Sequence, residues 1–372
     1  MNKMKVCLIS KPDHREWRDI IKRLAPLQEK ITIHVYAPGY EVDNDEIGAA
    51  KTPVFYDRLD ESLKGADMII NLLGCPEPDY AGYKPLAGKY HIDLHKAKTL
   101  GALLSGDEIW REMDRLAAAI NDANLQEAVI INAGRMPDII TAYLKKAHHI
   151  TGYGISRKAD QTVDTLLEAT SLSAYRGRLT YKLAGVCDHL WVAEIADQDG
   201  KDFYPQLREK IKDLDLNITR NDLTGEGLRS LKFYGYYHSA NVAAQATAEI
   251  IFKLISAYLS AEKTTVYLNA VNDGSINGLD TDAVVEIPFI FTDRKISREK
   301  VNLPLPCVLA IDDPAGAVIM TVKTLITKSA TIFKRTIKLD PYLAPRLTLA
   351  ELDDLAEGLL QHGGLKGLFK EE

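Results

Sequence analysis

Residues 269–288 decide the fold of the second half of this chain and read NAVNDGSINGLDTDAVVEIP. The stretch predicts a strand over residues 265–271, a turn at Asn272-Asp273-Gly274 and a second strand over residues 283–290. Gly274 permits a tight turn, whereas Pro288 has no N–H and is expected to end the pairing of the second strand. Two strands joined by a polar loop indicate an antiparallel element in this half of the chain.

The first half of the chain alternates short apolar runs with amphipathic stretches, which indicates βαβ units and a parallel sheet. Strands are expected at residues 6–9, 31–36, 66–73 and 128–132. Helices are expected at residues 14–25, 107–122 and 137–147. This alternation is typical of a Rossmann-like domain, which we place over residues 1–150.

The pattern changes after residue 150, and we predict a second domain of α+β type over residues 151–372. Its first expected elements are a helix over 159–169 and a strand over 180–186. Further helices are expected at 240–260, 314–335 and 348–361, and residues 363–372 are expected to form a loose tail. The fold class is therefore α/β, with a Rossmann-like domain followed by an α+β domain.

Composition limits the function. The 372 residues carry a net charge of −6, which argues against nucleic-acid binding because phosphate recognition needs a clustered basic face. No apolar stretch approaches the length of a membrane span, so no membrane partner is expected. The four cysteines show no disulfide or zinc spacing, which predicts reduced thiols in the cytoplasm.

The first strand lacks the glycine-rich loop that usually binds a dinucleotide. It ends in Ser10-Lys11-Pro12-Asp13-His14, and no acidic residue follows the second strand directly. One interpretation is a nonstandard nucleotide site, with Ser10 and a helix N-terminus facing the phosphates and Glu41 or Asp43 facing the ribose. The other is a Rossmann scaffold that binds no nucleotide.

Residues 269–288 are similar, almost position by position, to a signature of glycoside hydrolase family 4, the NAD-dependent glycosidases. Four other stretches resemble that family in the same order, namely residues 66–71, 130–141, 185–191 and 233–237. The resemblance implies a nucleotide-binding first domain and a second domain of the type shared by lactate and malate dehydrogenases and family 4 glycosidases.

The resemblance also implies a reaction on a sugar or sugar derivative. In the family, NAD+ takes a hydride from C3, a divalent metal such as Mn2+ polarises the sugar oxygens, and a tyrosine removes the C2 proton. The leaving group is then eliminated from C1. The expected cofactors are NAD and a divalent metal, the expected partner is a small sugar ligand, and family members are commonly homo-oligomers, for which the apolar helix over 240–260 is a candidate interface.

For the metal, the resemblance points to His189, with Cys187 two residues earlier as a possible second ligand. Asp188 between them is a further candidate for the catalytic site. Gly154 stands where the family has its metal-binding cysteine. Depending on the register, Phe233 or Tyr234 occupies the position of the tyrosine base, with Tyr236 and Tyr237 nearby. Tyr234 and Tyr236 are the catalytic candidates, although clustered tyrosines also occur in ordinary packing.

For the ligands, the resemblance places Asn71 beside the nicotinamide and Asn132 near the sugar. Arg135 is the candidate for binding an anionic sugar, because a guanidinium group matches a phosphate or carboxylate, although a surface position is the commoner outcome. Independently of the family, His91 and His95 have the i, i+4 spacing of a metal pair on a helix.

Two functions follow. The first is an NAD- and metal-dependent glycosidase. The alternative is a noncatalytic or altered relative, a sugar-binding protein or partner subunit, which the missing glycine loop, ribose acid and metal cysteine favour. A hydroxyacid dehydrogenase is a third interpretation, but the sequence lacks a convincing His-Asp-Arg constellation.

Overall fold

The computed structural model describes most of the chain. The described residues are 3–11, 16–40, 53–75, 80–155, 158–186, 189–203, 205–207, 232–233, 240–361, 365 and 367–370. They divide into a first unit of Met1–Ile155, Ala244–Phe252 and Gly316–Glu372 and a second unit of Ser156–Ala243 and Lys253–Ala315. The domain division at residue 150 stays a prediction. The first compact unit also includes two segments from the later half of the sequence, so the units do not follow a single boundary.

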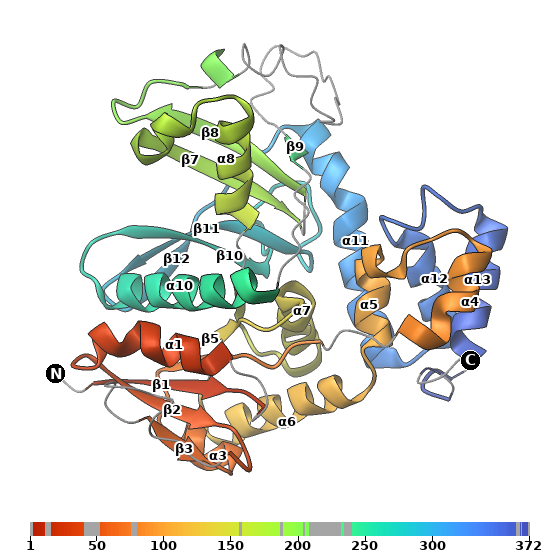
Figure 1. Cartoon of the computed structure of the whole chain (residues 1–372), viewed down its shortest axis with the longest axis horizontal. Coiled ribbons are helices and arrows are strands. Elements are labelled where there is room, and N and C mark those ends of the chain that lie inside the picture. The colour runs from red at the N-terminus through yellow and green to blue at the C-terminus, as the bar shows by residue number, and fades with distance from the viewer. Residues whose placement is uncertain are drawn as a thin grey trace. The chain divides into compact units, whose positions relative to one another are not determined.

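The first unit is built on a parallel sheet (Figure 1), as the buried apolar runs predict. The strand order is β3-β2-β1-β4-β5-β6. The strands are β1 (Met4–Ile9), β2 (Ile31–Tyr36), β3 (Val54–Tyr56), β4 (Met68–Asn71), β5 (Val129–Asn132) and β6 (Tyr153–Ile155). Every residue of β4 and β5 is buried, as in sheets covered on both faces.

Helices complete the first unit. Those that follow or precede the strands are α1 (Glu16–Leu24), η1 (Ala25–Leu27), α3 (Leu59–Leu63), α6 (Glu108–Asp122) and α7 (Pro137–His148). A separate helical lobe combines a segment after β4 with the C-terminal helices. Its members are η2 (Tyr80–Tyr83), α4 (Lys84–Lys89), η3 (Leu94–Lys96), α5 (Lys98–Leu104), α12 (Ala330–Leu339) and α13 (Leu349–Gln361).

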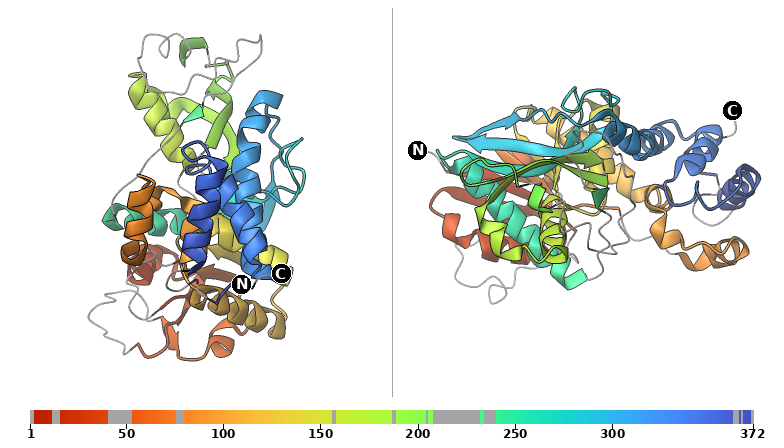
Figure 2. Two further views of the ribbon diagram at one scale, coloured as in Figure 1. Left: turned by 90° about the vertical axis from the view of Figure 1, so that its right-hand side faces the viewer. Right: turned by 90° about the horizontal axis from the view of Figure 1, so that it is seen from above.

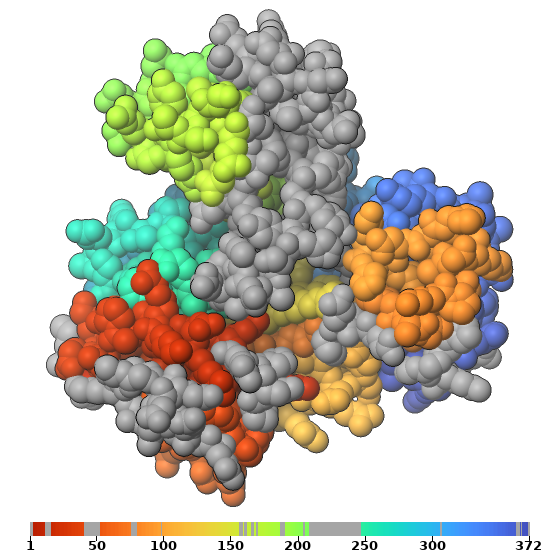
Figure 3. Space-filling model, in the orientation of Figure 1, coloured from red at the N-terminus to blue at the C-terminus, as the bar shows by residue number. Residues whose placement is uncertain are grey.

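The helical lobe is held together by polar contacts between segments far apart in sequence. Figures 2 and 3 show α12 and α13 beside α4 and α5. Asp340, which is fully buried, accepts hydrogen bonds from the Thr99 hydroxyl and from the N–H of Leu343. The Lys89 ammonium and the Asp354 carboxylate form an ion pair on the surface. The C-terminal helices therefore belong to the first unit.

The second unit contains an antiparallel sheet in the order β10-β11-β7-β8-β9, with β12 pairing on β11. Its elements are α8 (Lys158–Ala169), η4 (Ser173–Arg178), β7 (Leu179–Val186), β8 (His189–Asp197), β9 (Lys232–Phe233), β10 (Thr264–Val271), β11 (Val284–Thr292) and β12 (Lys295–Arg298). Helices α10 (Ala240–Leu259) and α11 (Leu305–Thr327) contribute residues to both units.

Three expectations from the sequence are wrong in detail. The helix over 314–335 is two helices, because Lys328 takes a left-handed conformation (φ 52°) and Ser329 caps α12. Pro288 does not end its strand, since β11 continues to Thr292. Residues 367–370 of the expected tail are not loose, because Phe369 is buried and the Lys370 N–H donates to the Lys328 carbonyl at 2.8 Å.

Helix α10 is the segment that the sequence offers as a candidate oligomer interface. Its described apolar residues lie inside the chain, with Ile251, Leu254 and Ile255 at 0% exposure. Their apolar character is thus explained by the core, and the oligomeric state stays a prediction. None of the helices in the described part of the chain combines the length and apolarity that a membrane crossing requires.

His34 makes stability depend on pH. It lies in β2, where its Nδ1 is 2.9 Å from the Tyr56 hydroxyl, and burial followed by repulsion from Lys5 lowers its pKa from 6.5 to about 4. Between pH 4 and pH 6.5, His34 is therefore protonated in the unfolded chain and neutral in the folded chain. We expect full stability from this residue above pH 6.5 and a loss of about 1–2 kcal/mol as the pH falls to 4, a figure reduced for solvent screening.

Urea denaturation at pH 7 and pH 4.5 would measure this effect. The variant His34→Phe is expected to show a smaller difference between the two pH values than the natural chain. His91→Asn, at an exposed position, is the control and should leave the difference unchanged. An equal pH dependence in all three proteins would contradict the assignment to His34.

Candidate functional site

The parallel sheet has a switch point between β1 and β4, because the chain leaves β1 toward β2 on one side and reaches β4 on the other. Open α/β sheets bind ligands at the carboxyl end of such a point. Ser10 follows β1 there, but it is only 1% exposed and its hydroxyl donates to the Lys11 carbonyl at 3.2 Å. Its N–H donates to the Tyr36 carbonyl at 3.0 Å. Neither donor of Ser10 is directed toward a ligand.

Lys11, Glu108 and Glu112 form a charged cluster at this edge, which we call the Lys11 cluster. The Lys11 ammonium lies 3.2 Å from a carboxylate oxygen of each glutamate. Burial by itself lowers the pKa of Lys11, but the hydrogen bonds and charges of the two glutamates raise it overall. The cluster therefore holds one positive and two negative charges, and the lysine is already paired.

Asn71 and Asn132 end β4 and β5 side by side, as expected for neighbouring parallel strands. The Asn71 amide donates to the Asn132 side-chain oxygen at 3.0 Å, and the Asn132 amide donates to the Thr141 hydroxyl at 2.9 Å. The Asn71 oxygen accepts the Leu73 N–H at 3.1 Å, and both asparagines are fully buried. The structure thus brings these two predicted site residues together, with their amides bonded to the chain itself.

The loops after β4 and β5 are in direct backbone contact. A Cβ on Gly134 would lie 2.5 Å from the Leu73 carbonyl oxygen, and the Cys75 N–H donates to the Arg135 carbonyl at 3.2 Å. Only residues without a side chain allow this approach. Arg135 itself is exposed, immediately before Met136 (φ 59°) and Pro137 at the start of α7. Its exposure is compatible with an anionic ligand and with an ordinary surface position.

An aromatic cluster lies at the carboxyl ends of β2 and β3, and we call its residues Trp17, Tyr40 and Phe55 the Trp17 cluster. The Trp17 ring centre is 4.9 Å from that of Tyr40 and 5.4 Å from that of Phe55. Trp17 is at 0% exposure, although it lies in the first turn of α1. The Arg18 guanidinium covers this cluster, 5.2 Å from the Trp17 ring centre. Large side chains therefore fill the space beside the start of α1.

The described residues contain no group of three or more His, Cys, Asp or Glu side chains that would hold a metal. Burial raises the pKa of the Cys7 thiol to about 11 and that of Cys75 to about 12, which disfavours the thiolate that metals bind. Gly154 lies in β6 and offers no side-chain ligand. The His91–His95 hypothesis is wrong, because His91 precedes a short 3-10 helix that begins at Leu94 and the two residues share no α-helix.

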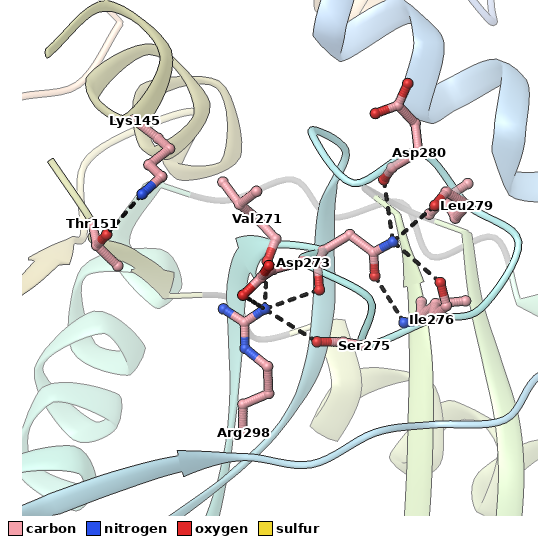
Figure 4. Close-up of polar contacts among 10 residues, drawn as sticks. Lys145, Thr151, Val271, Asp273, Ser275, Ile276, Leu279, Asp280 and Arg298 are labelled. Carbon is pink, nitrogen blue, oxygen red and sulfur yellow. Dashed lines mark hydrogen bonds and ion pairs between the residues drawn. The ribbon is translucent and has the colours of Figure 1, made fainter. Parts of the chain in front are cut away.

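The loop between β10 and β11 is a closed polar structure. The Asn272 side chain donates to the carbonyls of Ile276 and Leu279, each at 3.1 Å, and accepts the Ile276 N–H at 2.8 Å. Figure 4 shows Arg298 on the other side of this loop. Its guanidinium donates to the Val271 carbonyl at 2.9 Å and lies 3.6 Å from the Asp273 carboxylate. Gly274 has φ +77°, as its predicted turn requires. The stretch that carries the resemblance thus stabilises its own loop.

Several predicted site residues lie outside the described residues. They are Glu41, Asp43, Cys187, Asp188, Tyr234 and Tyr236. His189 begins β8, where it pairs with Val186 of β7, but its side chain is also outside the described part. Their roles stay predictions.

The Lys11 cluster was missed from the sequence. Glu108 and Glu112 have the i, i+4 spacing that places two carboxylates on one helix face, which was the available signal. Lys11 and Glu108 are 97 residues apart, and nothing local indicates that they meet.

The described residues do not fit a dinucleotide bound in the usual way. Residues 10–16 contain no glycine, and α1 begins with Glu16 and Asp19, which disfavour an anion at a helix N-terminus. The Lys11 cluster adds negative charge at the same edge. The fit of a metal is equally poor in the described part, because the thiol groups there are buried and Gly154 replaces a ligand.

Comparison with known proteins gives a family and a fold. Residues 229–343 match the family 4 glycosyl hydrolase C-terminal domain. No curated protein matches the sequence. The 6-phospho-beta glucosidase from Thermotoga maritima, solved with NAD and glucose-6-phosphate, is similar in structure with a TM-score of 0.71 at 14% identity, covering 99% of this chain and 100% of its own.

Two further solved structures place this similarity in context. The 6-phospho-alpha-glucosidase from gut microorganisms, solved with NAD and Mn2+, has a TM-score of 0.67 at 13% identity and covers 100% of both chains. Lactate dehydrogenase from Eimeria maxima, solved with NADH and oxamate, has a TM-score of 0.56 at 14% identity and covers 88% of this chain and 96% of its own. The predicted fold class, a Rossmann-like domain followed by an α+β domain of this type, is confirmed. The chain carries the C-terminal domain of the family 4 glycosyl hydrolases, and the resemblance to that family found in its sequence is confirmed.

Proposed function

We propose that this chain is a glycosidase-like protein of carbohydrate metabolism that binds a sugar or sugar derivative. The observation that carries the proposal is the combination of the family 4 domain match over residues 229–343 with a similarity that extends over the whole chain. The lactate dehydrogenase covers less of the chain at a lower TM-score, which favours the glycosidase over the dehydrogenase. We further expect a cytoplasmic homo-oligomer.

The family route by C3 oxidation and C2 deprotonation requires NAD and a divalent metal, and the names of the similar structures include both. The described residues of this chain do not fit the dinucleotide, so we do not assign that route to it. Within the family route, Tyr234 or Tyr236 would act as the base, Asp188 is a further catalytic candidate, and His189 with Cys187 would hold the metal; a chain without that route leaves these residues without those roles. The Lys11 cluster favours the second candidate function, a sugar-binding or partner protein without the family chemistry.

A ligand titration tests the proposal. The melting temperature of the full chain would be followed with glucose-6-phosphate, galactose and glucuronate, because a ligand at about 100 times its dissociation constant adds about 2.7 kcal/mol of stability. We expect at least one sugar to raise the melting temperature, and the anionic sugars to depend on Arg135, which Arg135→Gln would reveal. A chain that none of these sugars or their aryl glycosides stabilises would contradict the proposal.

Turnover separates the two candidates. Aryl glycosides and aryl 6-phosphoglycosides would be incubated with the chain, with and without NAD+ and Mn2+. Release of the aryl group supports a glycosidase, whereas binding without release supports the noncatalytic relative.

A further inference from the structure

The switch point between β1 and β4 is where a dinucleotide lies in folds of this kind, with its pyrophosphate at the end of the first strand and its adenosine toward the second strand. Described residues border both positions in this chain, although residues 12–15 and 41–52 lie outside the described part. The end of β1 is followed by Ser10 and Lys11, and the end of β2 by residues 37–40. The first helix, α1, begins beside both.

The pyrophosphate position carries the wrong charge. Helix α6 precedes the parallel strand β5, so its first turn lies at the carboxyl edge of the sheet, and from there Glu108 and Glu112 reach Lys11 at 3.2 Å each. One Glu112 oxygen is buried and accepts no hydrogen bond from a described residue. A pyrophosphate with two negative charges would meet an excess carboxylate here, and its approach would require the lysine to leave two short ion pairs.

The adenosine position is filled. Trp17 packs edge to face on Tyr40 and on Phe55, and the Tyr40 and Phe55 rings are tilted against each other, with ring centres 4.9–5.4 Å apart. The Gly39 N–H, at the end of β2, donates to the Asp57 carboxylate at 2.8 Å, so this backbone group is also bonded within the chain. An adenine ring would have to displace Trp17, which is at 0% exposure.

We propose that the switch point of this parallel sheet does not bind a dinucleotide, because the Lys11 cluster occupies the pyrophosphate position and the Trp17 cluster occupies the adenosine position. Any reaction of this chain on a sugar then proceeds without a dinucleotide bound at that point. The inference does not rest on the proposed function, since sugar binding and dinucleotide binding are measured separately.

The first test uses the natural full chain. NAD+, NADH and ADP-ribose would each be titrated to about 1 mM, with isothermal calorimetry and the melting temperature as readouts. We expect no saturable heat and no shift in melting temperature. A dissociation constant of about 10 µM would give about 2.7 kcal/mol of stabilisation at this concentration. Saturable binding of any of the three compounds would overturn the proposal.

A second test addresses the Lys11 cluster alone. Inorganic pyrophosphate needs no adenosine pocket, so its binding depends on charge at the end of β1. The double variant Glu108→Gln/Glu112→Gln releases Lys11 and is expected to bind pyrophosphate at least tenfold more tightly than the natural chain, with an affinity that falls as salt rises. If the double variant binds pyrophosphate no better than the natural chain, the role given to the Lys11 cluster is wrong.

The matched control variant has the same net charge as the Glu108→Gln/Glu112→Gln variant. Asp122→Asn/Glu127→Gln also removes two carboxylates, from exposed positions at the other end of α6 and beyond it. We expect this control to bind pyrophosphate as weakly as the natural chain. An equal gain in both double variants would show a general charge effect and would overturn the assignment to Lys11.

Discussion

Replacing Gly74 with alanine is expected to lower the free energy of unfolding by more than about 3 kcal/mol, a large fraction of the stability of an ordinary domain. The new Cβ would overlap the backbone nitrogen of Arg135 and lie 2.9 Å from the Gly134 carbonyl carbon. Both contacts are with backbone, which cannot rotate away as a flexible side chain can.

The backbone around Gly74 is also fixed on both sides. The Cys75 N–H donates to the Arg135 carbonyl at 3.2 Å, and the Ala133 N–H donates to the Asn71 carbonyl at 2.8 Å. Relief of the overlap would therefore break the contact between the loops after β4 and β5, where Asn71 and Asn132 are held.

Urea denaturation followed by circular dichroism measures this loss. Gly82→Ala is the control, because a Cβ at that position would meet nothing within 4 Å. The control is expected to change stability by less than about 1 kcal/mol. A Gly74→Ala protein as stable as the control would contradict the contact between the two loops.

Replacing Asn272 with alanine is expected to cost about 3–5 kcal/mol. The side chain is at 0% exposure, and its two N–H groups share the carbonyls of Ile276, Leu279 and Asp280, each at 3.1 Å. Its oxygen accepts the Ile276 N–H at 2.8 Å. Alanine would leave these buried groups without partners, which is the costly case for hydrogen bonds.

The variant Asn272→Asp separates the hydrogen bonds that the Asn272 amide donates from the one that its oxygen accepts. An aspartate still accepts the Ile276 N–H, but it has no proton for the three carbonyls and places a buried charge against them. We expect it to be at least as destabilising as alanine in urea denaturation. Asn302→Ala, at an exposed position, is the control and should stay within about 0.5 kcal/mol of the natural chain. Tolerance of Asn272→Asp would mean that the loop does not depend on the amide.

Local patterns in the sequence predicted most strands and helices, because burial on both faces leaves a continuous apolar run. Residues 66–73 and 128–132 are examples, and the structure gives β4 and β5 there, each fully buried. The break between α11 and α12 was missed because it depends on one left-handed residue, Lys328, which has no glycine-like signal. The helix expected from residue 314 begins earlier in the structure, at Leu305.

The candidate site was less predictable than the fold. Asn71 and Asn132 were found because both end parallel strands, and such ends meet at one edge of the sheet. Their bonding to each other and to Thr141, rather than outward, depends on side-chain directions that no spacing encodes. The Lys11 cluster depends on a contact across 97 residues, which lies beyond any local pattern.

The helical lobe has a consequence for synthesis of the chain. The segment after β4 emerges from the ribosome long before α12 and α13, yet Thr99 finds its partner only in Asp340. The apolar residues of α5 must therefore wait for more than two hundred further residues, and contacts of such long range slow folding. A chain that stops before α12 lacks both the helix that packs on α5 and the carboxylate that accepts from Thr99.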